Sequence, residues 1–372
     1  MNEAGTGLSR LWQNFPVRSR HRWINLLLVA VPAAIAIHFL YPNPILSFII
    51  AGVAIIPLAG ILGEATEDLA EHVGSTLGGI LNATMGNATE LIIAFFALRL
   101  GHVQVVKASL SGSIIGNLLL VLGLSIIAGG IGRQKQTFSR EATGANSTMM
   151  FIAVVALIMP AVYDLSLYGN LRQNPMLVEL SLAASAVLIL VYLASFIFML
   201  KTHKSLFHGR DESGEAKPHG SVIRPLVTLA SATVLIGFLS EILVGEIDSV
   251  TRSLGMTEVF VGVIVVAIIG NAAEHSTAIM AARRNQMDLA MSIAVGSSTQ
   301  IALFVAPLLV FLSVLIGHPM SLVFGPLEIA SIVLSVLIVH MISADGETNW
   351  FEGAQLVAVY LILAVSFYFI PA

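Results

Sequence analysis

The chain has 372 residues, of which 56% are hydrophobic and 11% are charged, with a formal net charge of −4. An ordinary soluble domain has about 25% charged residues, so this composition does not fit a soluble globular fold. The balance of 18 Lys and Arg against 22 Asp and Glu gives no basic signature for nucleic acid, and the absence of cysteine excludes disulfides and thiolate metal sites.

Apolar stretches long enough to cross a lipid bilayer, about 20 residues each, recur along the whole chain. They are continuous, whereas the strands of an outer-membrane barrel would alternate apolar and polar residues. The predicted helices cover residues 24–41, 45–72, 75–99, 106–130, 146–167, 176–200, 223–246, 258–282, 288–316, 321–343 and 353–371. The sequence therefore predicts an all-α polytopic membrane protein with eleven transmembrane helices.

Basic residues are unevenly distributed over the predicted connecting segments. With a cytosolic N-terminus, fourteen of the 18 Lys and Arg fall on the cytosolic side, which fits the positive-inside rule. The polar stretch 201–222 then becomes a cytosolic linker. It separates a first half, 45–200, from a second half, 223–372, and residues 1–44 hold the cytosolic N-terminus and the first helix.

The two halves share a pattern at an offset of 184 residues. The matching pairs are Gly86 with Gly270, Asn87 with Asn271, Glu90 with Glu274, and Gly112-Ser113 with Gly296-Ser297. Two separate patterns at one offset indicate an internal duplication. Each repeat holds five helices, an odd number, so the second copy enters the membrane from the opposite side. This predicts two inverted-topology five-helix repeats with a site near the midplane at their interface.

Each repeat places one carboxylate, Glu90 or Glu274, inside an apolar helix. An ionised carboxylate at mid-membrane costs about 3 kcal/mol, so it is expected to face a cavity, a partner or an ion. Two carboxylates in a low dielectric cannot both stay charged without a cation. The pair should therefore bind either a cation or protons, and this competition is the basis of cation/proton exchange. The alternative is that both acids are protonated and only form interhelical hydrogen bonds.

Oxygen-bearing neighbours surround this carboxylate pair. Gly86 and Gly270 weaken the helix before each Glu and release backbone carbonyls, while Asn87 and Asn271 add amide oxygens. An all-oxygen set with two negative charges suits Ca²⁺, which takes about 6–8 oxygens, better than Mg²⁺. Residues expected to support the cavity, or else to form interhelical hydrogen bonds, are Thr89, His275, Ser113, Asn117, Ser297, Ser298 and Gln300.

Further acidic residues lie near predicted helix ends. At the cytosolic end of the second helix they recur at helical spacing, and there they would either concentrate cations at an entrance or form a solvated face. The candidates on that side are Glu64, Glu67, Asp68 and Glu71. Glu241 and Glu258, near the outward ends of the seventh and eighth helices, are candidates for an external entrance.

The stretches "LNATMGNATELIIAFFAL" and "VFVGVIVVAIIGNAAEHSTAI" closely resemble the two repeats of the Ca²⁺/H⁺ antiporter (cation/proton exchanger) family, part of the Ca²⁺/cation antiporter superfamily. The resemblance extends through "PLAGILGEATEDLA" and "SADGETNWFEGAQLVAVYLILA" and covers nearly everything from residue 45 onward. It implies a sodium/calcium exchanger-like fold that exchanges cytosolic Ca²⁺ for H⁺ without a cofactor. It also implies that Glu90 and Glu274 are the shared cation/proton carboxylates.

Other functions fit the sequence less well. The repeats of Na⁺/Ca²⁺ exchangers usually carry a Ser-Pro-Glu or Pro-Asp pattern, and neither motif here contains proline. An intramembrane metallohydrolase would need a second His at helical spacing from Glu274-His275, and none is present. A passive cation channel is a further alternative, and it differs from an antiporter because its cation flux would not depend on protons or move them. The short N-terminus favours a microbial plasma (inner) membrane over a vacuolar one.

Overall fold

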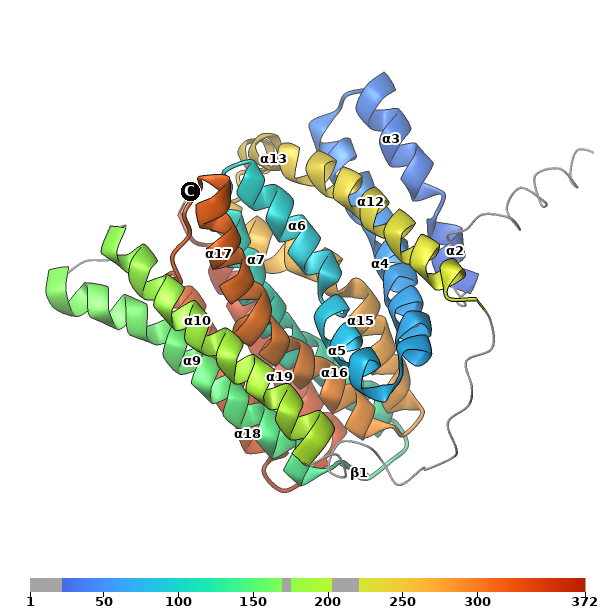
Figure 1. Ribbon diagram of the computed structural model, residues 1–372, viewed down its shortest axis with the longest axis vertical. Coiled ribbons are helices and arrows are strands. Elements are labelled where there is room, and N and C mark those ends of the chain that lie inside the picture. The colour runs from blue at the N-terminus through green and yellow to red at the C-terminus, as the bar shows by residue number, and fades with distance from the viewer. Residues whose placement is uncertain (1–21, 169–174, 203–220, 372) are drawn as a thin grey trace, which may run out of the picture.

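The computed structural model describes residues 22–168, 175–202 and 221–371, and in these ranges it is a bundle of helices (Figure 1). The predicted cytosolic N-terminus up to residue 21 and most of the predicted linker, 203–220, lie outside the described residues. One short strand pair occurs, in which β1 (Gln136–Thr137) runs antiparallel to β2 (Glu347–Thr348).

The helices of the first half follow the predicted order. They are α2 (Arg22–Leu27), α3 (Ala30–Leu40), α4 (Pro44–Val73), α5 (Ser75–Met85), α6 (Ala88–Arg99), α7 (Val103–Ile115), the π-helix η1 (Gly116–Val121), α8 (Leu122–Gly130), α9 (Arg140–Tyr168), α10 (Pro175–Ile197) and the π-helix η2 (Phe198–Thr202). The helices α7, η1 and α8 form one continuous span, 103–130.

The helices of the second half repeat this plan. They are α12 (Ile223–Gly245), α13 (Ile247–Leu254), α14 (Glu258–Phe260), η3 (Val261–Val266), α15 (Ala267–Arg283), α16 (Met287–Gln300), η4 (Ile301–Val305), α17 (Ala306–Ile316), α18 (Pro326–Ser343) and α19 (Trp350–Tyr368). The π-helices η1 and η4 end at Val121 and Val305, which are 184 residues apart, so a local distortion recurs at the predicted repeat offset.

Among the described residues, nine helices are long and apolar enough to cross a membrane, and the bent pair α5–α6 makes a tenth when counted as one span. The predicted helix 75–99 is therefore two helices, which meet at an angle of 47° around Gly86-Asn87. The apolar helix Asn25–Leu40 is shorter than these spans. The eleventh transmembrane helix remains a prediction.

Several predicted boundaries were wrong because capping residues were overlooked. The helix predicted from 146 begins at Arg140, where the Ser139 hydroxyl accepts a hydrogen bond from the Ala142 N–H. The helix predicted from 353 begins at Trp350, since Asn349 and Glu352 form a capping box. The helix predicted from 321 begins only at Pro326, in the favoured first position of a helix.

Two further corrections concern the outer ends of the helices. The span predicted from 106 begins at Val103, so Lys107, at the predicted start of that span, lies within α7 with only 4% of its surface exposed. The segment between the seventh and eighth predicted helices contains the short helix α13, which has polar and apolar residues on opposite sides. Such a short helix lacks the long apolar run by which the spans were recognised.

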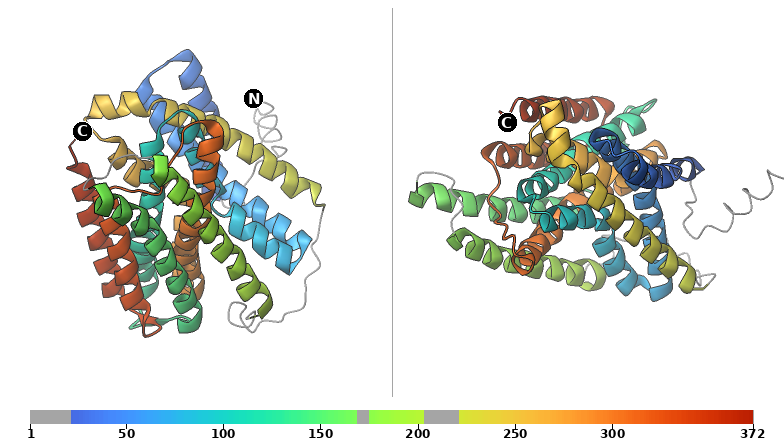
Figure 2. Two further views of the ribbon diagram at one scale, coloured as in Figure 1. Left: turned by 60° about the vertical axis from the view of Figure 1, so that its left-hand side comes forward. Right: turned by 90° about the horizontal axis from the view of Figure 1, so that it is seen from above.

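The most buried part of the bundle is the span 103–130. In its apolar window 83% of residues are buried, against 22% for α19 and 28% for α10. The helices α9 and α10 lie along one side and α2 and α3 along the opposite side (Figures 1 and 2). α4 packs against α12, the corresponding first helix of the second half. The Gly112-Ser113 motif thus lies in the most enclosed span, whereas the apolar window of the span that carries Glu274, Glu258–Arg283, is 39% buried.

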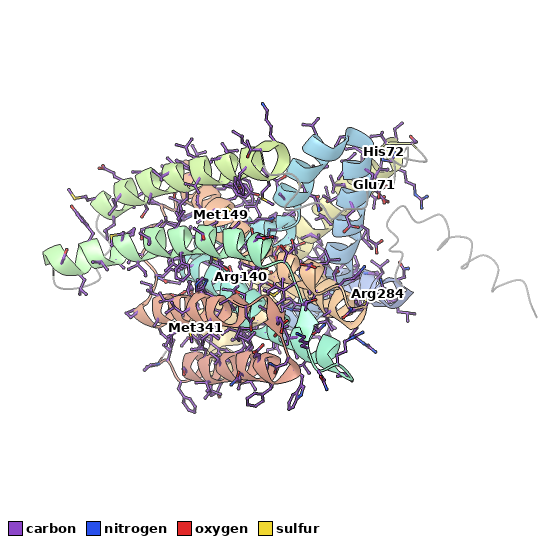
Figure 3. All side chains as sticks on the ribbon, turned by 90° about the horizontal axis from the view of Figure 1, so that it is seen from below. Glu71, His72, Arg140, Met149, Arg284 and Met341 are labelled. Carbon is purple, nitrogen blue, oxygen red and sulfur yellow. The ribbon has the colours of Figure 1, made fainter. Side chains whose placement is uncertain are left out.

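The connecting segments sort to two ends of the bundle, as predicted. At one end β1 and β2 pair, Lys135 forms an ion pair with Glu347 at 2.6 Å, and the Ser139 N–H donates to Asp288. Figure 3 is seen from this end and labels Glu71, Arg140 and Arg284 at separate places across it. This is the end that the distribution of basic residues predicts to face the cytosol.

A close crossing of α7 and η3 brings the two repeats together. A Cβ atom added to Gly112 would lie 2.1 Å from the Val263 carbonyl oxygen, and one added to Gly262 would lie 2.5 Å from the Ala108 Cβ. Small residues allow helix backbones to approach this closely in membranes. The crossing sets the position of Ser113, which follows Gly112 and reaches the second motif.

We expect Gly112→Ala to lower the thermal midpoint of the purified protein in detergent, since overpacking costs about 1–3 kcal/mol. Gly116→Ala is the matched control, because it lies one turn further along the same span and has open space around it. This control should be neutral or slightly stabilising, because Ala is favoured over Gly in a helix. Equal midpoints for the two variants would contradict the crossing.

Candidate functional site

The two motif glutamates lie on spans of different shape. Glu90 lies in the first turn of α6, directly after the bend at Gly86-Asn87, and it is 8% exposed. Glu274 lies in the middle of α15, which continues through its Gly-Asn pair without a break, and its side chain is partly exposed. The same motif thus produces a helix start in one repeat and a helix interior in the other.

The glycine of each motif faces the glutamate of the other motif. A Cβ atom on Gly270 would lie 3.2 Å from the Glu90 Cγ, and a Cβ atom on Gly86 would lie 3.9 Å from the Glu274 Oε1. The two carboxylates are also close enough to interact electrostatically. This reciprocal arrangement is what a pseudo-two-fold axis between the repeats predicts.

Glu90 has no hydrogen-bond partner for its Oε1 among the described residues, although that atom is buried. Buried polar atoms in native proteins nearly always have a partner, and an exception indicates an unplaced ion, proton or water. The Glu90 carboxyl lies against Gly270, and Gly270 in turn lines a cavity. The site therefore offers a buried carboxyl oxygen that has no partner in the described part of the protein.

A cavity of about 360 Å³ reaches Glu274 from the predicted cytosolic end, and Glu90 is not among the described residues that line it. It lies between α4, α5, α15 and α16. Glu64 and Glu67 line its outer part, and Thr89, Glu274 and Gln300 line its deep part. Asp68 and Glu71 lie on the same end of α4 but are not among the described residues that line the cavity. Part of the predicted acidic face therefore borders the route to the glutamates.

Ser297 connects the two motifs. Its Oγ lies 2.7 Å from the Asn87 Oδ1 and 2.8 Å from the Glu274 Oε2, and it accepts a hydrogen bond of 3.2 Å from the Asn117 Nδ2. Asn87 in turn donates from its Nδ2 to the Gln300 Oε1 at 2.6 Å. The predicted residues of α6 and α16 thus form one connected network around Glu274.

A second group of hydrogen bonds fixes Asn271. Its Nδ2 donates to the Ser113 Oγ and to the Ala267 carbonyl, both at 2.8 Å. Its Oδ1 accepts from the Asn117 Nδ2 at 3.0 Å. Both ends of the Asn271 amide are therefore used between helices, and Asn117 joins this group to Ser297. In this conformation these side chains hold the motif in place.

Four of the expected supporting residues are not among the described residues that line the cavity: Ser113 and Asn117, which hold Asn271, and Ser298 and His275. The Ser298 hydroxyl donates to the Ala294 carbonyl of its own helix at 2.9 Å and contacts the Ile114 carbonyl at 3.4 Å, so it joins α16 to α7. His275 is partly buried and is not among the cavity-lining residues, and its Nε2 has no partner in the described part of the chain.

The two expected outer residues lie in different surroundings. Glu241 is exposed on α12. Glu258, in the first turn of α14, lies close to His102 and Asp248. Sequence reasoning missed this grouping, because the three residues are far apart in the chain and follow no motif spacing.

Sequence reasoning also missed a buried pair of charged residues. The Lys107 Nζ donates to the Ser321 Oγ at 3.2 Å and to the Val323 carbonyl at 2.9 Å. Glu328, 5% exposed, accepts hydrogen bonds of 2.8 Å from the Ser111 hydroxyl and the Gly325 N–H, and it interacts electrostatically with Lys107. These contacts join the outer part of α7 to the start of α18.

Comparison with known proteins gives consistent results. A profile of the family described as "Sodium/calcium exchanger protein" matches residues 43–201 and 224–369. A protein of Aphanothece halophytica named Ca(2+)/H(+) antiporter is 44% identical over 359 residues, which cover 93% of this chain and 96% of that protein.

Solved structures show the same fold. The structure of native YfkE has a TM-score of 0.81 and 40% identity, and the match covers 93% of this chain and all of that one. The H⁺/Ca²⁺ exchanger CAX is similar in fold, with a TM-score of 0.70 at 14% identity over 93% of this chain and 91% of that one. The chain belongs to the sodium/calcium exchanger family, and the resemblance to its Ca²⁺/H⁺ antiporters that the two glutamate motifs predicted is confirmed.

Proposed function

We propose that this protein is a secondary antiporter that moves Ca²⁺ out of the cytosol in exchange for H⁺, with Glu90 and Glu274 binding either the cation or protons. The names of the relatives support the two substrates. The observation on which the site assignment rests is the buried Glu90 carboxyl, which has an oxygen without a partner and interacts with Glu274. We also infer that the halves 45–200 and 223–372 are the inverted repeats.

The hydrogen bonds of Ser297 support a proton-loaded site. A serine hydroxyl carries one hydrogen and can donate to one acceptor at a time. The Asn87 Oδ1 and the Glu274 Oε2 both lie within 2.8 Å of the Ser297 Oγ. Both short contacts are satisfied when Glu274 is protonated and donates to Ser297, while Ser297 donates to Asn87. Removal of this proton leaves a carboxylate oxygen that can bind a cation.

The oxygen chemistry of the site favours a hard divalent cation. Carboxylate, hydroxyl and amide oxygens of Glu274, Thr89 and Gln300 border the deep part of the cavity. Ca²⁺ accepts such ligands in variable geometry, and Mn²⁺ and other divalent cations share part of this preference. Because the ligands must lose protons before they bind the cation, transport of the two ions is coupled.

Access to the site follows from the position of the cavity. It opens at the end of the bundle that the positive-inside rule assigns to the cytosol, and Glu64 and Glu67 would raise the local cation concentration there. One wall belongs to α4 and the other to α15 and α16, so closure on this side requires these walls to approach each other. We place the protein in a microbial plasma (inner) membrane with a cytosolic N-terminus.

We expect Glu90→Gln and Glu274→Gln each to abolish coupled exchange, because Gln keeps the shape of the side chain but cannot carry a charge. The measurement is Ca²⁺ uptake into proteoliposomes under an imposed pH gradient without Na⁺, with a pH-sensitive dye recording proton movement. Glu179→Gln, at an exposed position on α10 away from the cavity, is the control and should transport normally. Ca²⁺ uptake with a silent dye in the unmodified protein would indicate a channel or another coupling ion.

The apparent affinity for Ca²⁺ should fall as the pH on the binding side falls, because protons occupy the carboxylates and exclude the cation. Over the range in which the carboxylates titrate, the apparent Kd should rise about tenfold per pH unit if one proton is displaced and about a hundredfold if two are displaced. Calcium binding to the purified protein, titrated calorimetrically at several pH values, measures this slope. An apparent Kd that does not change with pH would show that Ca²⁺ binding displaces no proton.

Gly270→Ala should weaken Ca²⁺ binding about tenfold or more, which corresponds to a loss of about 1.4 kcal/mol. The reason is that the new Cβ would lie 3.2 Å from the Glu90 Cγ and would displace the Glu90 carboxyl. Gly63→Ala is the matched control, because Gly63 borders the same cavity but has open space around it. Calorimetric binding of Ca²⁺ to both variants tests the contact. Equal affinities in the two variants would show that Glu90 need not remain against Gly270.

A further inference from the structure

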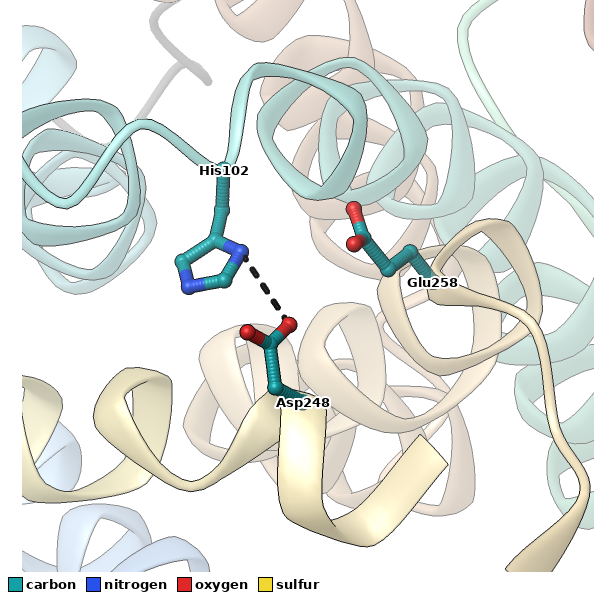
Figure 4. A group of neighbouring side chains, drawn as sticks. All are labelled: His102, Asp248 and Glu258. Atoms are coloured by element: carbon teal, nitrogen blue, oxygen red, sulfur yellow. Dashed lines mark ion pairs between the residues drawn. The ribbon is translucent and has the colours of Figure 1, made fainter. Parts of the chain in front are cut away.

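His102, Asp248 and Glu258 come together at the end of the bundle opposite β1 and β2, which is the predicted outer end (Figure 4). One ligating atom from each side chain lies within 4.8 Å of the others. His102 immediately precedes α7, Asp248 lies in the first turn of α13, and Glu258 lies in the first turn of α14. Both halves of the chain therefore contribute to the group.

The distances within this group suit a shared metal ion better than direct hydrogen bonds. The His102 Nδ1 and the Asp248 Oδ1 are 3.9 Å apart, which exceeds the length of a hydrogen bond. Bonds from zinc to imidazole nitrogen and to carboxylate oxygen are about 2.0–2.2 Å long, so two ligands of a tetrahedral ion lie about 3.4 Å apart, and the group would have to draw together slightly around the ion. Small rotations of the side chains would bring all three atoms into coordination.

The mixture of ligand types sets the class of ion. Ca²⁺ and Mg²⁺ bind oxygen ligands, and an imidazole nitrogen adds little to their affinity. Zinc and its neighbours among the transition metals combine imidazole with carboxylate, and a site with three protein ligands leaves a coordination position for water. The group therefore differs in preference from the all-oxygen Glu90–Glu274 site.

The side chains are accessible from the aqueous phase. His102 is 16% exposed and Asp248 is 56% exposed, so an ion can enter without opening the bundle. The scaffold around them is defined: Arg252 donates to the Asp248 main-chain carbonyl at 2.9 Å, and the Thr257 hydroxyl caps α14 by accepting from the Phe260 N–H. The three ligands thus project from helix starts with fixed positions.

An ion in this position would connect parts of the bundle that carry the two walls of the cavity. Asp248 lies just beyond α12, and α12 packs along α4. His102 precedes α7, and Glu258 begins the span that continues into α15 with Glu274. A bound ion would therefore tie the outer end of the α4–α12 pair to the helices that hold the glutamates.

We propose that His102, Asp248 and Glu258 form a binding site for a divalent transition-metal ion of the zinc class at the outer surface, and that the bound ion slows transport by restraining α12 relative to α7 and α14. This site is separate from the cation/proton site and goes beyond the proposed exchange activity.

The first test is calorimetric titration of the purified full-length protein with Zn²⁺ in buffer without Ca²⁺. Wild type should bind one equivalent of Zn²⁺. In His102→Gln and in Asp248→Asn the affinity for this equivalent should be at least tenfold weaker. His340→Gln, which removes an exposed His on α18, should bind as wild type does. Because the two variants change different ligands, a folding defect in one of them would not decide the test. Size-exclusion chromatography checks that each variant is folded.

Unchanged Zn²⁺ binding in both ligand variants would overturn the proposal, and so would displacement of the bound Zn²⁺ by an equal concentration of Ca²⁺. Because the readout is binding, its failure is distinct from a failure of the exchange activity.

The second test is inhibition of Ca²⁺ uptake by Zn²⁺ added on the side of the vesicle that faces the outer ends of the helices. Wild type and His340→Gln should slow severalfold at zinc concentrations that saturate the site. His102→Gln and Asp248→Asn should keep the uninhibited rate. Equal inhibition of all four proteins, or saturation of the site without any change in rate, would show that the ion does not restrain α12.

Discussion

The buried carboxyl of Glu90 is the constraint on which the rest of the structure depends. In apolar surroundings, charge interactions are strong and an unpaired charge is costly, so this group must hold a proton or face a cation. Its Oε1 has no partner in the described protein, and its neighbour Glu274 carries a second potential charge. In the exchange that we propose, this pair has one stable state with protons bound and another with a cation bound. Exchange of one for the other follows from that property.

Close packing of helices makes this pair tolerable. The hydrophobic effect does not drive helices together inside a bilayer, so small residues and polar contacts between helices must do so. Gly112 and Gly262 allow α7 and η3 to cross at backbone distance, and Gly270 leaves room for Glu90. The amides of Asn117 and Asn271 then join α7, η1, α15 and α16 through buried hydrogen bonds. The polar groups at the site are therefore positioned by the same interhelical contacts that join these helices.

The two repeats are related but not equivalent in this conformation. The first motif lies at a bend of 47° between α5 and α6, whereas the second lies within the continuous helix α15 and is preceded by the π-helix η3. Glu274 consequently lines the cavity, while Glu90 is buried against Gly270. Alternating access across a pseudo-two-fold axis requires the two halves to exchange such surroundings. In the antiport mechanism that we propose, this difference between the repeats would reverse when the cavity closes on one side and opens on the other.

The sequence by itself determined the membrane class, most of the spans, their sorting to two ends and the pairing of Glu90 with Glu274. Long apolar runs and a duplicated motif are local patterns, and they remain readable without contacts. Only the tertiary structure decided that Ser297 joins Asn87 to Glu274, that Glu64 and Glu67 border the cavity, and that Lys107 is buried. It alone brought His102 to Asp248 and Glu258. These groupings depend on the crossing of helices distant in the chain, and the geometry of a crossing is set by packing that no local pattern records.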